Sequence, residues 1–337
     1  MDLSCWDSRQ SPDPAFVATW MARLARSPHA NFEMRPDFLA LDAQHGRSAI
    51  AVLVEDPPAL MVLRRVRGGW ACGWPWRLHM TVESAPPGPP AFSDAQRRSL
   101  LAALGAVTDG ALTRCYLPEA LDDGAPAFEA GTTFMHGLER SEDALFGTFD
   151  ATRRRMVRKA GNEGFEVVEA HTLEQFRGFA LLQAETERRR GRTPAPVPEH
   201  VADSGQSWRE WELPWMQLLV AMRDGQVVAG SGFGFSPGST VDYRTNASQL
   251  EVRRYGVNIA LAWEALRRSR TAGARWLNWG GSTEFKRTLG GTSMTIWCRL
   301  GGGPVWALPN RMTASWHRTR PRLAELWKSL QRRAGSS

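Results

Sequence analysis

The amino-acid sequence predicts an α/β protein in which helices and strands alternate along the chain. Three observations carry this prediction. The composition is that of an ordinary globular chain, with 42% hydrophobic and 23% charged residues. Apolar residues recur at helical spacing in some segments and in short β-type runs in others. The length of 337 residues fits about two domains of roughly 150 residues, each large enough to bury a core.

The first 144 residues contain both kinds of segment. Ser93 is a helix cap that precedes an apolar-periodic run. A Pro/Gly-rich run at residues 85–91 predicts a surface loop between regular elements. The expected helices are 14–26 and 93–107, and the expected strands are 48–54, 60–66, 112–117 and 132–138.

The second half of the sequence also alternates between helical and strand segments, and the ends of these segments are marked more clearly. Asp224-Gly225 between two apolar runs is a strong signal for a β-hairpin. Gly164 and Gly273 mark helix ends, and residues 193–198 predict a second Pro-rich loop. The expected helices are 149–162, 173–190 and 257–272, and the expected strands are 165–170, 216–222, 226–235, 241–245 and 275–279.

Four stretches of the second half follow one another in a characteristic order. They are the Arg-rich run 153–160 with Gly161 and Gly164, the hairpin 221–230, the segment 258–281 that ends in Gly280-Gly281, and the run 285–290 that begins Phe285-Lys286. In this order and spacing the chain resembles the FemAB-like group of tandem GNAT-fold transferases, which includes the BioF2-like acetyltransferase domains. The resemblance covers about residues 145–291.

The resemblance implies two GNAT-like lobes, each a mixed sheet flanked by helices. The domain prediction is therefore an N-terminal lobe over 1–144, assigned by analogy with the family, a C-terminal FemAB-like lobe over 145–309, and a C-terminal helix over 310–337.

The activity implied is transfer of an aminoacyl group from aminoacyl-tRNA, or of an acyl group from acyl-CoA, onto an amine. Positioning and electrostatic stabilisation are sufficient for such amide formation, so no covalent enzyme intermediate is required. Either donor is a co-substrate, and no tightly bound cofactor is expected. The acceptor is left open among a peptidoglycan precursor, a polysaccharide amine and a small natural product. The alternative from another class is a non-catalytic GNAT-like module that binds an anionic ligand.

Positive charge is concentrated in the second half. Residues 145–337 hold 29 basic and 17 acidic side chains, a net charge of +12, whereas residues 1–144 hold 13 and 18, a net charge of −5. A basic half favours a polyanionic partner such as tRNA. Solubilising charge is the alternative.

Lys286 is the first catalytic candidate, because it is one of only three lysines and lies beside Phe285 in the segment that matches the family. A desolvated ammonium there would polarise the acyl carbonyl or hold a phosphate of the donor. The alternative is a lysine in water at the end of a strand. Tyr243, one of three tyrosines, is the second candidate, as a group that relays a proton.

Residues 253–258 partly match the pyrophosphate-binding motif of acetyl-CoA-dependent GNAT enzymes. Arg253 and Gly256 fit the motif, and Asn258 departs from it at the last position. Backbone N–H groups at the start of a helix bind phosphate well. An ordinary helix start is the alternative.

Arg154, Arg158 and Lys159 lie on one predicted helix, where spacing of four residues brings Arg154 beside Arg158. Two guanidinium groups on one face hold a phosphate well, so these residues are predicted to bind substrate phosphate. We expect Arg158, Lys159 and Lys286 to face one shared hollow. A solvated helix face is the alternative.

Several other classes are disfavoured. The four cysteines form no CxxC pair, the seven histidines show no metal-ligand spacing, and neither a P-loop nor a Gly-x-Ser-x-Gly elbow occurs. No metal is therefore expected. No window approaches ~18 apolar residues, so we expect a cytoplasmic protein without stable membrane insertion, or one that lies peripherally at the inner membrane face. The run 230–234, GSGFG, predicts close approach of another group to a strand.

Overall fold

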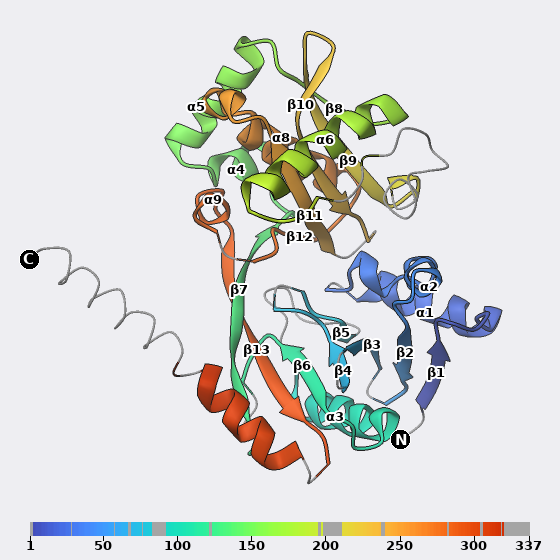
Figure 1. The fold of residues 1–337 in the computed structure, drawn as a ribbon. Helices are drawn as coiled ribbons and strands as arrows, with labels where there is room; N and C mark the ends of the chain where they lie inside the picture. The colour runs from blue at the N-terminus through green and yellow to red at the C-terminus, as the bar shows by residue number, and fades with distance from the viewer. Residues whose placement is uncertain are drawn as a thin grey trace, which may run out of the picture.

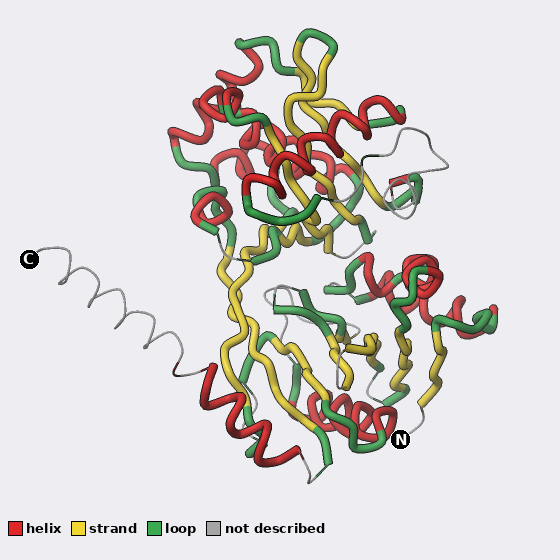
Figure 2. The backbone as a smooth tube through the Cα atoms, viewed as in Figure 1, coloured by secondary structure: helices red, strands yellow, loops and turns green. Residues whose placement is uncertain are grey.

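The computed structural model shows two lobes joined by a pair of long strands (Figures 1 and 2). In the part of the chain that the structure describes, thirteen strands form a sheet. Twelve of them follow one another in the order β1-β2-β3-β4-β6-β13-β7-β12-β11-β10-β9-β8, and β5 pairs with β3 beside this path. The described residues are 3–27, 29–56, 58–66, 69–75, 77–82, 92–120, 123–194, 197, 211–236, 240–281, 283–303, 306–317 and 319.

The first lobe is formed mainly by the helices and strands from β1 to β6. Helix α1 begins where Asp13 accepts a hydrogen bond from the N–H of Ala15, and α3 begins with a capping box at Ser93. The elements are β1 (Leu3–Asp7), α1 (Pro14–Arg26), η1 (Phe32–Met34), α2 (Pro36–Gln44), β2 (Ala49–Val54), β3 (Ala59–Val66), β4 (Gly69–Cys72), β5 (Met80–Val82), α3 (Asp94–Thr108) and β6 (Thr113–Leu117).

The second lobe is built around the predicted hairpin. Asp224 and Gly225 both have positive φ, at 51° and 74°, as a tight two-residue hairpin turn requires. The elements are α4 (Glu142–Gly147), α5 (Ala151–Asn162), β8 (Glu166–Glu169), α6 (Leu173–Arg189), β9 (Met216–Arg223), β10 (Gln226–Gly234), β11 (Thr240–Ser248), η3 (Glu251–Tyr255), α8 (Val257–Thr271), β12 (Trp276–Asn278) and α9 (Glu284–Arg287).

Two long strands connect the lobes. Strand β7 (Ala127–Gly137) enters the second lobe, where it pairs with β12, and β13 (Thr292–Gly301) returns to the first lobe, where it pairs with β6. The two strands pair with each other along most of their length (Figure 2). Hydrogen bonding of the sheet therefore runs through both lobes, and a strand within the predicted domain 145–309 completes the sheet of the first lobe. The predicted domain boundaries themselves stay predictions.

Each lobe buries apolar side chains on both faces of its part of the sheet. In the first lobe, alternate residues of β2 and β3 pack against α3 on one face and α1 on the other. In the second lobe, α6 covers one face through Phe176 and Phe179, and α8 covers the other through Leu261 and Leu266. The predicted mixed α/β class is confirmed, and the sheet is held between helices in both lobes.

Three glycines of β10 bring aromatic rings against the backbone, as the GSGFG run predicts. A Cβ atom at any of them would overlap the ring that covers it. The pairs are Gly230 with Phe179, Gly232 with Trp211, and Gly234 with Phe32. The last pair joins the lobes, because Phe32 belongs to η1 of the first lobe.

The predicted helices and strands are found, with ends shifted by a few residues. The largest shifts are the first residue of β7, which lies five positions before the predicted one, and the last residue of β11, which lies three positions after it. The predicted loop 85–91 lies outside the described residues, as does part of 193–198. The predicted C-terminal helix 310–337 is described only as far as residue 319, with helix over residues 307–317.

Candidate functional site

The site lies where two parallel strands separate. Strands β11 and β12 pair only over three residues, from Thr240 with Trp276 to Asp242 with Asn278. Beyond Asp242, β11 continues beside β10, while β12 ends. The opening therefore begins at Tyr243 on one strand and at Gly280 after the other. Where β11 and β12 diverge, their backbone groups and side chains are available to a ligand.

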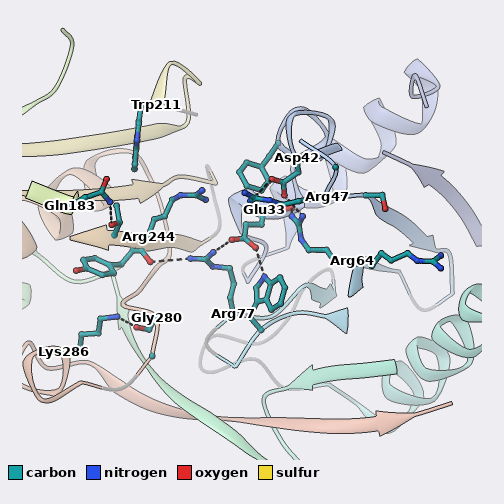
Figure 3. Close-up of a pocket in the computed structure, with 18 of the residues that line it drawn as sticks. Glu33, Asp42, Arg47, Arg64, Arg77, Gln183, Trp211, Arg244, Gly280 and Lys286 are labelled. Carbon is teal, nitrogen blue, oxygen red and sulfur yellow. Dashed lines mark hydrogen bonds and ion pairs between the residues drawn. The ribbon is translucent and has the colours of Figure 1, made fainter. Parts of the chain in front are cut away.

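Two cavities, of about 800 Å³ and about 600 Å³, meet at this opening. The larger lies between the lobes and is lined by side chains of both, whereas the described residues that line the smaller all belong to the second lobe. Figure 3 shows the larger cavity, with Gln183, Arg244 and Lys286 on one side and the first-lobe residues Asp42, Arg47 and Arg64 on the other. The residues shared by both linings are Gln183, Tyr243, Arg244, Thr245, Thr283 and Lys286.

Lys286 is positioned by the short helix α9. Thr283 caps this helix by accepting a hydrogen bond from the N–H of Lys286, at 3.3 Å. The Nζ atom donates to the carbonyl oxygen of Gly280 and lies 4.6 Å from the centre of the Tyr243 ring. Burial, and to a smaller extent the positive charge of Arg77, lowers the pKa of Lys286 to about 8. The ammonium is therefore held in a partly desolvated position where the cavities meet.

Tyr243 forms an aromatic wall of the opening. Its ring packs against Phe233 and Trp279, with centroids at 5.6 Å and 5.9 Å. Burial raises the pKa of Tyr243, so the hydroxyl stays protonated at neutral pH and is a proton donor rather than a base.

The smaller cavity contains the start of helix α8. Gly256 precedes the helix with φ of +84°, and a Cβ there would lie 2.6 Å from the carbonyl oxygen of Met156. Arg253 Nε and Asn258 Nδ2 both donate to Ser248 Oγ, at 3.0 Å and 3.2 Å. The Oδ1 atom of Asn258 is buried without a hydrogen-bond partner in the described chain. The first N–H groups of a helix lack intrahelical acceptors, so this arrangement suits an anion.

Arginines dominate the charged lining of the larger cavity. Three of them pair with acids of the first lobe: Arg47 and Arg64 with Asp42, and Arg77 with Glu33. The charged residues from both lobes are Glu33, Asp42, Arg47, Arg64, Arg65, Arg77, Arg244 and Lys286. The excess of positive charge favours a ligand that carries a carboxylate or a phosphate.

A buried polar network links the first lobe to the loop that Lys286 contacts. Arg77 Nε donates to Asp242 Oδ1 at 3.1 Å, across the two lobes. Asn278 Nδ2 donates to the same oxygen at 3.0 Å, and its own Oδ1 accepts from the N–H of Gly280 at 2.9 Å. Because the Gly280 carbonyl accepts from Lys286, the position of the ammonium is coupled to the interface between the lobes.

The network contains strongly shifted acids. Burial favours a raised pKa for Glu33, but the charge of Arg77 and the hydrogen bond from His79, at 2.8 Å, lower it well below its ordinary value. Burial raises the pKa of Asp242 to about 6, against the opposing effect of Arg77. Asp242 Oδ2 has no hydrogen-bond partner within the described residues. Glu33 is therefore a charged counter-ion of Arg77 at neutral pH, whereas the carboxyl of Asp242, with its pKa raised to about 6, changes charge in mildly acidic solution.

The structure brings six of the nine predicted site residues together. All six line the smaller cavity, and two of them also line the larger one. They are Tyr243, Arg253, Gly256, Asn258, Phe285 and Lys286.

The other three predicted residues, on α5, line neither cavity. Arg154 donates to the carbonyl of Phe149, Arg158 lies over the Phe146 ring at 5.7 Å, and Lys159 donates to the carbonyl of Arg254 at 3.4 Å. The expectation that Arg158 and Lys159 share a hollow with Lys286 is wrong, because that side of α5 faces α4 and η3. Arg153, on the same helix, lines the smaller cavity instead.

Two negative findings concern the described part of the chain alone. It contains no group of three or more His, Cys, Asp or Glu side chains placed to hold a metal ion. None of its helices has the length and apolar character needed to cross a bilayer.

The hairpin, the diverging parallel strands and the following helix α8 give the second lobe the GNAT fold. In agreement, residues 149–287 match the family model of the GNAT acetyltransferase domain. This match indicates an acyltransferase, and domains of this type use acyl-CoA as co-substrate. A search of curated proteins found no significant match.

Three solved structures have the same overall fold. The crystal structure of FemX aligns with a TM-score of 0.64 and 13% identity, over 92% of this chain and 100% of that one. A conserved protein of unknown function from Bacteroides thetaiotaomicron VPI-5482 gives 0.58 and 10%, over 87% and 99%. The C-terminal domain of a putative lysylphosphatidylglycerol synthetase from Agrobacterium fabrum gives 0.53 and 14%, over 89% and 97%. At these identities the likeness concerns the fold.

Proposed function

We propose that this chain transfers an acyl group from a coenzyme A thioester onto an amine. The donor would occupy the smaller cavity and the acceptor the larger one. The observation that supports this most directly is that both cavities are lined by Tyr243 and Lys286, since transfer requires donor and acceptor to meet at one point.

The smaller cavity suits the pyrophosphate of the donor. The start of α8 supplies backbone N–H groups, Gly256 keeps side-chain atoms out of the turn, and Arg253 and Arg153 line the same cavity. Helix starts and guanidinium groups are both good phosphate ligands. The family-model match over residues 149–287 includes all of these groups.

The proposed step is direct attack of the amine on the thioester carbonyl. The C–N bond forms and the C–S bond breaks through a tetrahedral intermediate. The Lys286 ammonium would donate to the oxyanion, and the protonated Tyr243 hydroxyl would supply the proton taken up by the leaving thiolate. The proton lost by the amine would pass to solvent in the larger cavity, and solvent would return a proton to the Tyr243 oxygen. Donors of this kind, fixed before the reaction, stabilise charge in the transition state.

The acceptor would be an amine that also carries an anionic group. Among the described residues, five arginines and two acids line the larger cavity. Its volume of about 800 Å³ is within the range of pockets for whole small molecules. A peptidoglycan precursor, an anionic polysaccharide amine and a small natural product fit this description. The proposed place of action is the cytoplasm, which supplies both candidate donors.

The second candidate donor is aminoacyl-tRNA. It is favoured by the net charge of +12 over residues 145–337 and by the exposed cations of α5 that line neither cavity, Arg155 and Arg158. The chemistry would be the same, with an ester in place of the thioester. Neutralising several phosphates together would make binding steeply dependent on salt.

A binding experiment separates the two donors. Coenzyme A and a charged tRNA would each be titrated into the wild-type protein, into Arg253→Ala and into the neighbouring control Arg254→Ala. Tenfold or greater weakening of coenzyme A binding by Arg253→Ala alone supports the proposal. Binding of charged tRNA in preference to coenzyme A, with affinity that falls steeply between 50 and 200 mM salt, would instead establish the second candidate.

The non-catalytic alternative is tested at Lys286. Lys286→Ala should abolish most amide formation, by about 100-fold or more, while coenzyme A binding is retained. The control is Lys159→Ala, which changes a lysine outside both cavities. Absence of any product with the wild-type protein and a panel of amines, together with intact ligand binding, would identify a binding module.

A further inference from the structure

The helix that follows β13 packs on the first lobe by one face. Ala314 is fully buried with Cys298 and Leu300, and Asn310 donates to the carbonyl of Gly301 at 3.2 Å. The ring of His317 stacks on Phe128, with centroids 4.0 Å apart and planes within 5°. The helix, residues 307–317, is therefore fixed to the sheet (Figure 1), and it contributes no residue to the two cavities.

The opposite face of this helix is apolar and exposed. Leu308, Met312 and Trp316 are exposed by 68%, 65% and 56%. Only two other large hydrophobic side chains of the described chain are comparably exposed, Leu181 and Leu250, and they belong to separate elements. Spacing of four residues aligns the three side chains in one row. We call this row the C-terminal stripe. Single exposed apolar residues are ordinary, but a contiguous row marks an interaction surface.

The sequence of this helix and of the residues that follow it is basic. The helix contains no Asp or Glu, and Arg311 is exposed beside Met312. The sequence that follows, residues 318–337, contains six basic side chains and one acidic side chain. A second copy of this chain would bring like charges together, which opposes docking of stripe on stripe. The complementary partner is one that offers both an apolar layer and negative charge.

We propose that the C-terminal stripe binds an anionic lipid surface. The helix would lie in the plane of the surface, with Leu308, Met312 and Trp316 inserted between head groups and Arg311 against lipid phosphates. A row of Leu, Met and Trp beside an arginine, on a helix without acids, is a composition typical of interfacial helices. At 11 residues the helix is about 16 Å long, so it is suited to lying on a bilayer and is far too short to cross one.

The inference does not depend on acyl transfer, because the C-terminal stripe and the cavities share no residue. It adds a location to the proposed function. The acceptor cavity would be held near a membrane surface, where lipid-linked or surface-bound amines are concentrated.

The test is co-sedimentation of the full chain with vesicles. Phosphatidylcholine vesicles with one-third phosphatidylglycerol would be compared with vesicles of phosphatidylcholine alone. The wild-type protein is expected to bind the anionic vesicles at least tenfold more tightly. The triple variant Leu308→Ser/Met312→Ser/Trp316→Ser should lose at least tenfold in affinity, whereas the control Leu181→Ser/Leu250→Ser should bind as the wild type does.

A second variant tests the same surface if the triple variant does not fold. Arg311→Glu changes one exposed side chain and should weaken binding to anionic vesicles severalfold, with an unchanged unfolding temperature. Failure of the wild-type protein to bind anionic vesicles would overturn the proposal, as would equal binding by the triple variant. Concentration-dependent dimerisation that the triple variant abolishes, without lipid binding, would assign the surface to a second copy instead.

Discussion

The Nζ atom of Lys286 lies 4.6 Å from the centre of the Tyr243 ring, at the junction of the two cavities. An ammonium is attracted to an aromatic face, and the Gly280 carbonyl accepts a hydrogen bond from the same atom. Contacts within the chain therefore hold this pair in place. A carbonyl that enters from the smaller cavity would meet a donor whose position is already fixed.

The pH dependence of turnover follows from this placement. Burial and Arg77 lower the pKa of Lys286 to about 8, so the ammonium predominates below that pH and is lost above it. If the ammonium stabilises the oxyanion, kcat should fall as pH rises through about 8. Lys286→Arg, which keeps its charge, should remove this fall. A rate that rises through pH 8 in the wild type would assign Lys286 the role of a base.

Tyr243→Phe tests the proton donor. The ring packing against Phe233 and Trp279 is retained, so stability and coenzyme A affinity should change little. Loss of the hydroxyl should lower kcat by about 100-fold, which is typical for removal of a positioned acid. Steady-state kinetics with the thioester as varied substrate would measure it. An unchanged kcat would leave protonation of the thiolate to solvent.

Asp242→Asn tests the buried network through stability. Folding raises the pKa of Asp242 from 3.8 to about 6, so the folded wild type binds more protons than the unfolded chain between these values. Its stability should therefore fall, relative to the variant, as pH rises from about 4 to about 6, by about 1 to 3 kcal/mol. Urea unfolding of both proteins at pH 4.5 and pH 7 measures this. A constant difference between them would show that Asp242 is ionised throughout.

Gly234→Ala tests the contact between the lobes. A Cβ at this position would overlap the buried Phe32 ring of the first lobe, so the variant should lose about 1 to 3 kcal/mol of stability. The control is Gly161→Ala within α5, where a Cβ meets nothing within 4 Å; this change should be neutral or slightly stabilising. Equal unfolding midpoints for the two variants would show that the lobes do not depend on this contact.

Local signals predicted much of the second lobe. Asp224-Gly225 identified the hairpin because a two-residue turn needs positive φ at both positions. Strand β13 was missed although its buried residues alternate, as Met294, Ile296 and Cys298 show. A period of two in that segment was a usable signal, but which lobe the strand would join depends on pairing with β6, which no local pattern reveals.

The site was predictable only where its residues are close in sequence. Residues 253–258 partly match the pyrophosphate-binding motif of GNAT enzymes, and Lys286 belongs to a segment whose place along the chain resembles that in the FemAB-like group. Arg77 and Asp242 are 165 positions apart, and their ion pair depends on how two lobes meet. On α5, spacing placed Arg154 beside Arg158 but did not say which side of the helix would face the cavity. The packing of α5 against α8 determines which side of α5 faces the smaller cavity, and Arg153 lies on that side.

The most direct test of the account is a comparison of two arginines on this one helix. Coenzyme A would be titrated calorimetrically into the wild type, Arg153→Ala and Arg158→Ala. Because Arg153 lines the smaller cavity and Arg158 packs on Phe146 outside it, the first variant should bind at least about tenfold more weakly, as expected for a lost charged phosphate contact, and the second within about twofold of wild type. Equal weakening, or weakening by Arg158→Ala alone, would contradict the placement of the donor in this cavity.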